Sequence, residues 1–591
     1  MSDIFYSTYN ARHLAPSEVA ETFIWSENFE KLIQNNHSIV LGARGCGKTT
    51  LMKMLTLPAL HNWKIDSRAE YVKNNIPFYA IYVSTDIYWN VKNLTYGSQL
   101  EKYGKFSEKL SHFAVSSNVF TSLCDTFMNI ISFDLLNKDE NKEIELSLEL
   151  IRTWKLHNVI PKLKFVKEAL NERIDEVNQF IQEVIFNYSV DDKIDYPEYY
   201  NLSFESSLES IIPKFQRIYN IPKNKKWALC FDELEFAPLW LQMRLFASLR
   251  SRTQYILYKL SASPILPSEL KKNILTQYGP TAGNDVRMIK MWKSKDAEQF
   301  SKKIIRSLLS DDSDLAQFFG SNEIYNKTSN TYVKGSKFYN EIMELTKKDQ
   351  SFTDFLIDKG IDLDNIEFDD EAKRDQLFRK IKPIVFFRNT FIKSNKDSII
   401  LNRSRKSVPE LYFGIEVLSK VCEGNPRWLK GIITQMLSRT QYERPSKAIQ
   451  YDELFEASER FKNVISNIPV GENKLTIFDL IDRIGKYFNN QILGSKFYMD
   501  PKGTIEVDDE ITKIYPKIIE LIEKAVSQGA LILLDTNDDS FDFKIEGQRF
   551  KLSYLFSILY SLPIRKYNKV NLNECMSGIE GDNYKQYLLF K

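Results

Sequence analysis

"IVLGARGCGKTTLMKML", residues 39–55, places three glycines and then Lys48-Thr49-Thr50 directly behind a short apolar run. The run 37–41 is typical of a buried strand, because central strands of parallel sheets are apolar throughout. The apolar residues at positions 51, 52, 54 and 55 suit the buried face of a following helix. A strand, a glycine-rich loop and a helix in this order predict a phosphate-binding loop.

Residues 42–49 match the pattern G-x-x-x-x-G-K-[ST] at every fixed position. The glycines let backbone N–H groups turn towards phosphate oxygens, and the helix N-terminus adds partial positive charge. We expect Lys48 to contact the β- and γ-phosphates of ATP and the Thr49 hydroxyl to bind Mg²⁺. The alternative is a glycine-rich loop with a surface lysine. The expected nucleotide-binding residues are Gly42, Ala43, Arg44, Gly45, Cys46, Gly47, Lys48, Thr49 and Thr50.

A second motif, WALCFDE at 227–233, consists of five apolar residues followed by two carboxylates. It predicts a buried parallel strand whose acids lie at the carboxyl end, where α/β sheets bind ligands. We expect Asp232 to hold Mg²⁺, directly or through water, and Glu233 to polarise the water that attacks the γ-phosphate. The alternative is an acidic turn after an ordinary strand. The sequence assigns no role to the nearby Glu235.

Three further stretches, 77–86, 255–264 and 284–292, have the composition of strands. The stretch at 255–264 ends in small polar residues. Ser261 or Ser263 would therefore touch the γ-phosphate or the attacking water, although either could instead be a turn serine.

Composition limits the class of protein. The chain of 591 residues is long enough for several domains, and its net charge of +2 means that nucleic-acid binding would need a local basic patch. Five scattered cysteines without a CxxC pair predict neither a zinc site nor a disulfide framework. The start has no signal-peptide pattern, and no apolar run approaches membrane-spanning length. We therefore expect a soluble cytoplasmic protein without a membrane partner.

A third motif, CEGNPRW at 422–428, predicts the start of a helix. Asn425 suits the N-cap and Pro426 the first helical position, and the apolar spacing continues to Met436. Arg427 would lie at the helix entry, where a guanidinium can pair with phosphate oxygens at two points.

These motifs in this order, with the segment 11–33 before them, resemble AAA+ ATPases of the origin-recognition and initiator type. The resemblance covers the catalytic core and the helical lid, and it implies that the N-terminal segment flanks the adenine pocket. The implied roles are Walker A for Lys48 and Thr49, Walker B for Asp232 and Glu233, sensor 1 for Ser261 or Ser263, and sensor 2 for Arg427.

The chain also departs from a compact AAA+ core. Helical spacing over about 95–215 predicts an inserted helical subdomain, and a polar stretch at 358–376 predicts a second insertion. No arginine finger is evident, because Arg250, Arg252 and Arg287 could each be a surface arginine.

The C-terminal third has helical spacing at 474–490, then a helix ending at Gly529, a strand, and two strands turning near Gly547. This order suits a winged-helix module, which the resemblance also implies. Its lysines are mixed with acids, so DNA contact and protein docking both remain open. We expect an α/β protein with an N-terminal segment at 1–36, a parallel-sheet AAA+ core at 37–300, a helical lid at 301–440 and a winged-helix-like domain at 441–591.

The leading hypothesis is a Mg²⁺-dependent ATPase that acts as a conformational or assembly switch for a partner protein or effector. Proteins with this resemblance include DNA initiators and large prokaryotic ATPases linked to antiviral defence, and the long insertions and the lack of a strongly basic region favour the latter. A homo-oligomer is compatible with this hypothesis. The alternatives are a DNA-binding initiator or loader, and a nucleotide-gated scaffold with little turnover.

Overall fold

The computed structural model describes residues 10–64, 66–85, 89, 103–136, 139–189, 192, 194–250, 255–276, 279–293, 297–309, 314–326, 334–361, 371–394, 400–401, 407–470, 475–514, 517–534 and 544–577.

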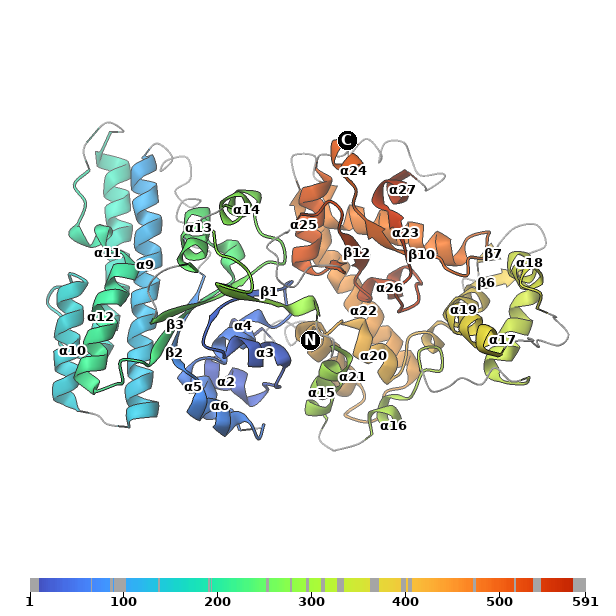
Figure 1. Cartoon of the computed structure of the whole chain (residues 1–591), viewed down its shortest axis with the longest axis horizontal. Helices are drawn as coiled ribbons and strands as arrows, with labels where there is room; N and C mark the ends of the chain where they lie inside the picture. Colours follow the sequence, from blue (N-terminus) through green and yellow to red (C-terminus); the bar gives the residue numbers. More distant parts are fainter. Residues whose placement is uncertain are drawn as a thin grey trace.

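A parallel sheet of five strands forms the centre of the nucleotide-binding half, and its strands are those that the sequence predicts (Figure 1). Every neighbouring pair in it is parallel. The order brings the phosphate-loop strand β1 beside β4, and β4 beside β3, so that their carboxyl ends meet at one edge. In spatial order the strands are β2 (Phe78–Ser84), β3 (Lys226–Asp232), β4 (Ile256–Ala262), β1 (His37–Leu41) and β5 (Val286–Lys290).

Helices cover both faces of this sheet, because side chains alternate along each strand. Ile39 and Leu41 pack into one core, whereas Val40 packs into the other. Short helices cover the Val40 face: α2 (Pro16–Glu21), α3 (Glu27–Leu32), α4 (Lys48–Lys53), α5 (Leu57–Asn62) and α6 (Ala69–Asn75).

The opposite face carries the long helical tract that the sequence predicts between β2 and β3, at one end of the molecule in Figure 1. Its elements are α9 (Gly104–Asn129), the π-helical η1 (Ile130–Leu135), α10 (Glu140–Thr153), α11 (Leu163–Asn187), η2 (Glu198–Asn201) and α12 (Phe204–Tyr219). Three shorter elements follow the strands: η3 (Leu234–Phe236), α13 (Leu239–Ser248) and α14 (Ser268–Ile274).

The region after β5 is mostly helical. Its elements are η4 (Met291–Lys293), α15 (Ala297–Ser307), α16 (Leu315–Phe319), α17 (Lys337–Thr346), α18 (Gln350–Asp358), α19 (Glu371–Phe391), β6 (Ile392–Ser394), β7 (Ile400–Leu401), η5 (Val408–Glu410), α20 (Ile415–Val421) and α21 (Pro426–Arg439). The predicted polar insertion at 358–376 lies partly outside the described residues, because 362–370 are not among them.

The C-terminal part contains a mixed sheet in the order β11-β12-β10-β13. Its elements are α22 (Lys447–Ser466), β8 (Pro469–Val470), β9 (Leu475–Thr476), α23 (Ile477–Leu493), β10 (Lys502–Glu506), α24 (Asp509–Ile514), α25 (Ile518–Gln528), β11 (Leu531–Leu533), β12 (Arg549–Leu552), α26 (Leu555–Leu559), β13 (Asn568–Asn571) and α27 (Leu572–Ser577).

One prediction for this part differs from the structure. The first strand expected before the turn near Gly547 lies partly outside the described residues, and its described part, 544–546, forms no strand. β12 pairs instead with the more distant β11 and β10. The predicted helix that stops at Gly529 is present: α25 ends there, and Gly529 has a φ of +79°, which glycine adopts without strain.

A single apolar core joins the region after β5 to the C-terminal part. It includes Leu418 of α20, Ile433 of α21, Leu454 of α22, and Ile484 of α23. α22 packs against both α21 and α26. The two parts are therefore built as one packed body. Within the described residues, no helix is long and apolar enough to cross a membrane.

Candidate functional site

The phosphate loop connects β1 to α4, as its glycine pattern predicts. Gly45 and Gly47 have φ values of +82° and +99°, which other residues adopt only with strain. A Cβ at Gly42 would clash with the Cys46 Sγ atom and would lie 2.9 Å from the Met291 Cβ atom. All three glycines are thus required by backbone conformation or by close contacts.

Lys48, the first residue of α4, points into the loop. Its Nζ atom donates a hydrogen bond to the Gly42 carbonyl oxygen at 2.6 Å and lies 3.1 Å from the Glu235 Oε1 atom. Burial alone would lower the pKa of Lys48, but the charge and hydrogen bond of Glu235, together with the charge of Asp232, raise that pKa. Lys48 is therefore a buried cation paired with Glu235, an acid to which the sequence assigned no role.

The two Walker B carboxylates lie at the end of β3, on the edge where the phosphate loop begins. Asp232 is fully buried, and the Ser261 hydroxyl donates to its Oδ1 atom at 2.5 Å. The Tyr82 hydroxyl donates to the Oδ2 atom at 3.2 Å. The Glu233 N–H group donates to Asp232 Oδ1 at 3.0 Å and to Ser261 Oγ at 2.9 Å. Ser261 thus connects both acidic residues.

The oxygen atoms present here suit Mg²⁺. In the described part of the chain, no group of three or more His, Cys, Asp or Glu side chains could hold a metal ion by itself. In nucleotide sites, Mg²⁺ is held by one or two protein oxygens together with phosphate oxygens and waters. Thr49, at the start of α4, and Asp232 supply such oxygens.

Glu233 adopts the left-handed conformation, with a φ of +56°. Its Oε2 atom lies 3.5 Å from Nη1 of Arg12, a residue that the motifs did not identify. Burial and the neighbouring Asp232 raise the pKa of Glu233, while Arg12 opposes this change. Arg12 belongs to the stretch at 11–33 that was expected to flank the adenine pocket. That expectation was the only indication in the sequence that Arg12 lies near the site.

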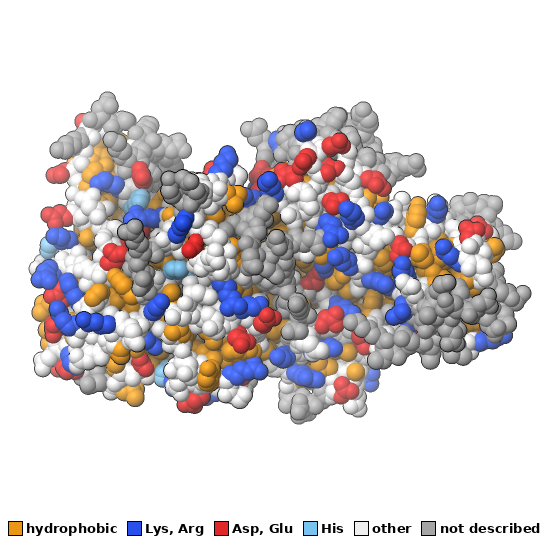
Figure 2. Space-filling model, viewed as in Figure 1, with side chains coloured by type: hydrophobic (Ala, Val, Ile, Leu, Met, Phe, Trp, Pro, Cys, Tyr) orange, Lys and Arg blue, Asp and Glu red, His pale blue; other side chains and the backbone are white. Residues whose placement is uncertain are grey.

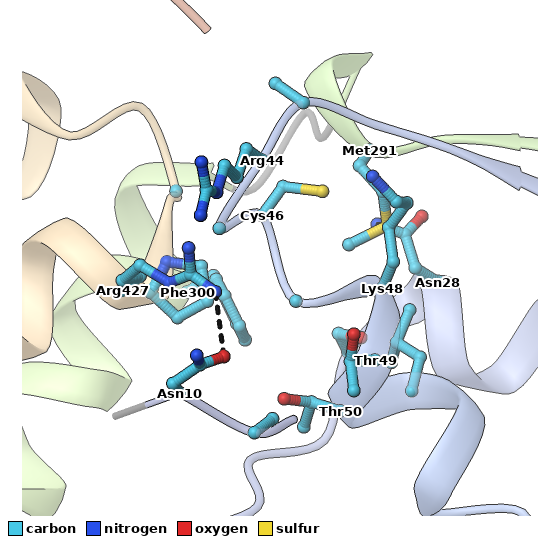
Figure 3. Close-up of a pocket in the computed structure, with 18 of the residues that line it drawn as sticks. Asn10, Asn28, Arg44, Cys46, Lys48, Thr49, Thr50, Met291, Phe300 and Arg427 are labelled. Atoms are coloured by element: carbon cyan, nitrogen blue, oxygen red, sulfur yellow. Dashed lines mark hydrogen bonds between the residues drawn. The ribbon is translucent and has the colours of Figure 1, made fainter. Parts of the chain in front are cut away.

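Arg427 begins α21, as predicted, and the cap is the predicted one. The Asn425 Oδ1 atom accepts the N–H groups of Arg427 and Trp428. An Arg427 Nη2 donates to Asn10 Oδ1 at 3.1 Å. Figure 3 shows Arg427 and Asn10 across the cavity from Lys48 and the threonines of α4.

Both backbone polar groups of Arg44, in the phosphate loop, form hydrogen bonds to distant parts of the chain. Its N–H donates to the Ser527 carbonyl oxygen at 2.9 Å, and its carbonyl oxygen accepts from Asn425 Nδ2 at 3.2 Å. The Ser263 hydroxyl lies 2.5 Å from the Ser527 hydroxyl. Ser263 therefore contacts the C-terminal part, whereas Ser261 contacts the two carboxylates.

Most of these residues, including Lys48, Thr49, Glu233 and Arg427, line one cavity of about 1730 Å³, whereas Asp232 and Ser261 are fully buried and do not line it. This volume exceeds the range of about 300–1,000 Å³ that is usual for ligand pockets. The loop between α2 and α3 contributes Trp25, and α15 contributes Phe300. The Arg68 guanidinium lies 5.0 Å from the Trp25 ring.

The three arginines considered as possible arginine fingers either lie away from this cavity or are outside the described residues. Arg250 is exposed and donates to the Gly279 carbonyl, and Arg287 is exposed on β5. Arg252 is outside the described residues. Lys551, a lysine of the C-terminal third, forms an ion pair with Glu423 and is mostly buried.

The comparison with known proteins agrees with this geometry. The model of the ORC-CDC6-like family matches residues 5–572, nearly the whole chain. No curated protein matches the chain significantly. The matched range includes the phosphate loop, the Asp-Glu strand and the helix that begins with Arg427. The chain belongs to the ORC-CDC6-like family and is an AAA+ P-loop ATPase of the origin-recognition and initiator-like type.

Proposed function

We propose that the chain hydrolyses ATP in a Mg²⁺-dependent reaction and uses the nucleotide cycle as a conformational switch. The observation that carries the proposal is the meeting of Lys48, Asp232 and Glu233 at one edge of the sheet. Lys48 and Glu233 line one cavity, and the buried Asp232 accepts a hydrogen bond from the Glu233 N–H group. A plain phosphate-binding site would not need Glu233 beside the metal-binding acid.

In this reaction a water oxygen attacks the γ-phosphorus, the bond from that phosphorus to the bridging oxygen breaks, and ADP and phosphate leave. Glu233 orients the water and accepts its proton. Lys48 neutralises the β- and γ-phosphate oxygens, and Arg427 approaches them from α21. Thr49 and Asp232 would hold Mg²⁺, which when bound supplies positive charge to the phosphates.

The contacts of Arg44 support the switch. α21 and α25 both bond to its peptide, and a shared apolar core joins the segments that carry these two helices. A nucleotide that moves the phosphate loop would therefore displace the lid-like helices and the winged-helix-like domain together. We infer that a partner protein reads this displacement.

Two variants test the enzymatic proposal. Glu233→Gln should retain ATP binding and lose turnover, because Asp232 is unchanged while the water is no longer oriented. Lys48→Ala should lose ATP binding, measured by calorimetry, because the phosphates lose their buried cation. Wild-type turnover by Glu233→Gln, or wild-type affinity by Lys48→Ala, would contradict the assignment.

The switch is tested by recovering partners from the native host with the Glu233→Gln and Lys48→Ala forms. A partner enriched on Glu233→Gln alone supports the proposal, and phage challenge of cells carrying each form tests the proposed setting in antiviral defence. Equal recovery with both forms contradicts the switch. ATP binding without turnover by the wild-type chain would support a nucleotide-gated scaffold instead.

A DNA-binding initiator or loader is the second candidate, because the family is named for initiator proteins. Acidic and basic side chains are interspersed on the face shown in Figure 2, which favours a protein partner over duplex DNA. Duplex binding that weakens steeply with salt would favour the loader. A ring or other homo-oligomer formed with ATP would be compatible with either candidate.

A further inference from the structure

The first described residues of the chain are fixed to the phosphate-loop helix. Lys53, in the last turn of α4, is buried, with 6% of its surface exposed. Its Nζ atom donates to the carbonyl oxygens of Ala11 at 2.8 Å, Arg12 at 3.1 Å and Leu14 at 2.7 Å. Because α4 begins with Lys48, the backbone of Arg12 has a fixed position relative to the phosphate-binding lysine.

Hydrogen bonds hold the backbone of Glu233, whereas its carboxylate is held less firmly. Its N–H group is bound by Asp232 and Ser261. Its Oε2 atom is buried and has no hydrogen-bond partner among the described residues. Arg12 approaches this atom at 3.5 Å, which is an ion-pair contact longer than a normal hydrogen bond.

The surrounding charges make this contact important. Asp232 and Glu235 lie close to Glu233 and repel its carboxylate, whereas Lys48 pairs with Glu235. A partly buried carboxylate in such surroundings needs a cation to hold its position, because Coulomb forces are weakly screened there. Arg12 provides that cation, and the carbonyl contacts of Lys53 keep its backbone in place.

We propose that Arg12 is a positioning residue for ATP hydrolysis: its guanidinium holds the Glu233 carboxylate in the orientation that activates water. The N-terminal segment is then part of the catalytic site as well as a wall of the nucleotide cavity. This inference rests on the proposed function, since it assigns a role within that reaction.

The test compares Arg12→Ala, Arg12→Lys and the control His13→Ala, an exposed neighbour in the same segment. Arg12→Ala should lower kcat by about ten- to a hundred-fold, the scale expected when a reacting group is misplaced by about 1 Å. The Kd for ATP should stay within about twofold. Arg12→Lys should recover part of the rate, and His13→Ala should match the wild type. Lys53 binds main-chain carbonyls, so these substitutions preserve its contacts.

A double-mutant cycle distinguishes positioning from direct phosphate binding. If Arg12 acts through Glu233, Arg12→Ala should not further lower the single-turnover rate of Glu233→Gln. A weaker Kd for ATP in both backgrounds would show that Arg12 binds phosphate itself, and would overturn the inference. A kcat for Arg12→Ala equal to or above that of the wild type would also overturn it.

The two proposals fail in different ways. If the wild-type chain binds ATP but shows no turnover, the proposed hydrolysis fails, and the role of Arg12 in it fails as a consequence. If the wild type and His13→Ala hydrolyse ATP and Arg12→Ala does so equally well, only the inference about Arg12 fails.

Discussion

Ser261 and Ser263, which are two residues apart on and just beyond β4, have different surroundings. The Ser261 hydroxyl bridges Asp232 and the Glu233 N–H group, whereas the Ser263 hydroxyl contacts Ser527. We expect Ser261→Ala to lower kcat by about ten- to a hundred-fold, because a lost hydrogen bond to a charged group costs about 1.5–3 kcal/mol.

Steady-state ATPase kinetics of both alanine variants check this assignment. Ser263→Ala removes no contact to either carboxylate, so it should reduce kcat less than Ser261→Ala. A larger loss in Ser263→Ala would assign the sensor role to Ser263 and contradict the ranking.

At the scale of an element, α21 depends on one side chain for two contacts. Asn425 Oδ1 caps the helix, and Asn425 Nδ2 bonds to the Arg44 carbonyl oxygen. Asn425→Ala should lose both and destabilise the first turn by about 1 kcal/mol. Asn425→Asp should keep the cap but lose the bond to the loop, because a carboxylate has no N–H donor.

Hydrogen exchange of the amides of Arg427 and Trp428 measures the cap, and calorimetry measures ATP affinity. Faster exchange is expected in Asn425→Ala only, whereas weaker ATP binding is expected in both variants. Equal protection of these amides in Asn425→Ala and the wild type would show that the cap does not stabilise the turn.

At the scale of the whole molecule, α25 connects the C-terminal part to the nucleotide-binding half. Glu523 Oε1 lies 3.6 Å from Lys271 Nζ on α14, next to the contact of Ser527 with the phosphate loop. Glu523→Lys replaces this attraction with repulsion. A fully exposed ion pair contributes about 0–1 kcal/mol, and this pair is partly buried. We therefore expect at least a severalfold rise in the population in which the C-terminal part is separated from the nucleotide-binding half.

The exposed Glu520 on the same helix provides the matched control, since it pairs with Lys524 and not with the core. Glu520→Lys changes the net charge equally and should leave docking unchanged. Distances between labels on the core and on the C-terminal part report the result. An identical separation in both variants would mean that the ion pair does not hold the two parts together.

The sequence by itself determined the features that depend on adjacent residues. The phosphate loop, the five strands and the cap of α21 were predictable because glycine conformation, apolar runs and capping act within a few residues. The helical tract between β2 and β3 was predictable for the same reason.

Only the tertiary structure decided which distant residues share the site. Asn425 and Arg44 are separated by 381 positions, and no local pattern records their contact. The parallel register of β3 and β4, which pairs Phe231 with Leu260, brought Ser261 rather than Ser263 to the acids, and the fold placed Arg12 against Glu233. β12 likewise pairs with β11 and β10, partners that the sequence pattern did not assign to it. Such pairings form when the whole chain packs around shared apolar cores. The apolar surface that one element buries depends on which other elements pack against it, so no local stretch of sequence specifies these pairings.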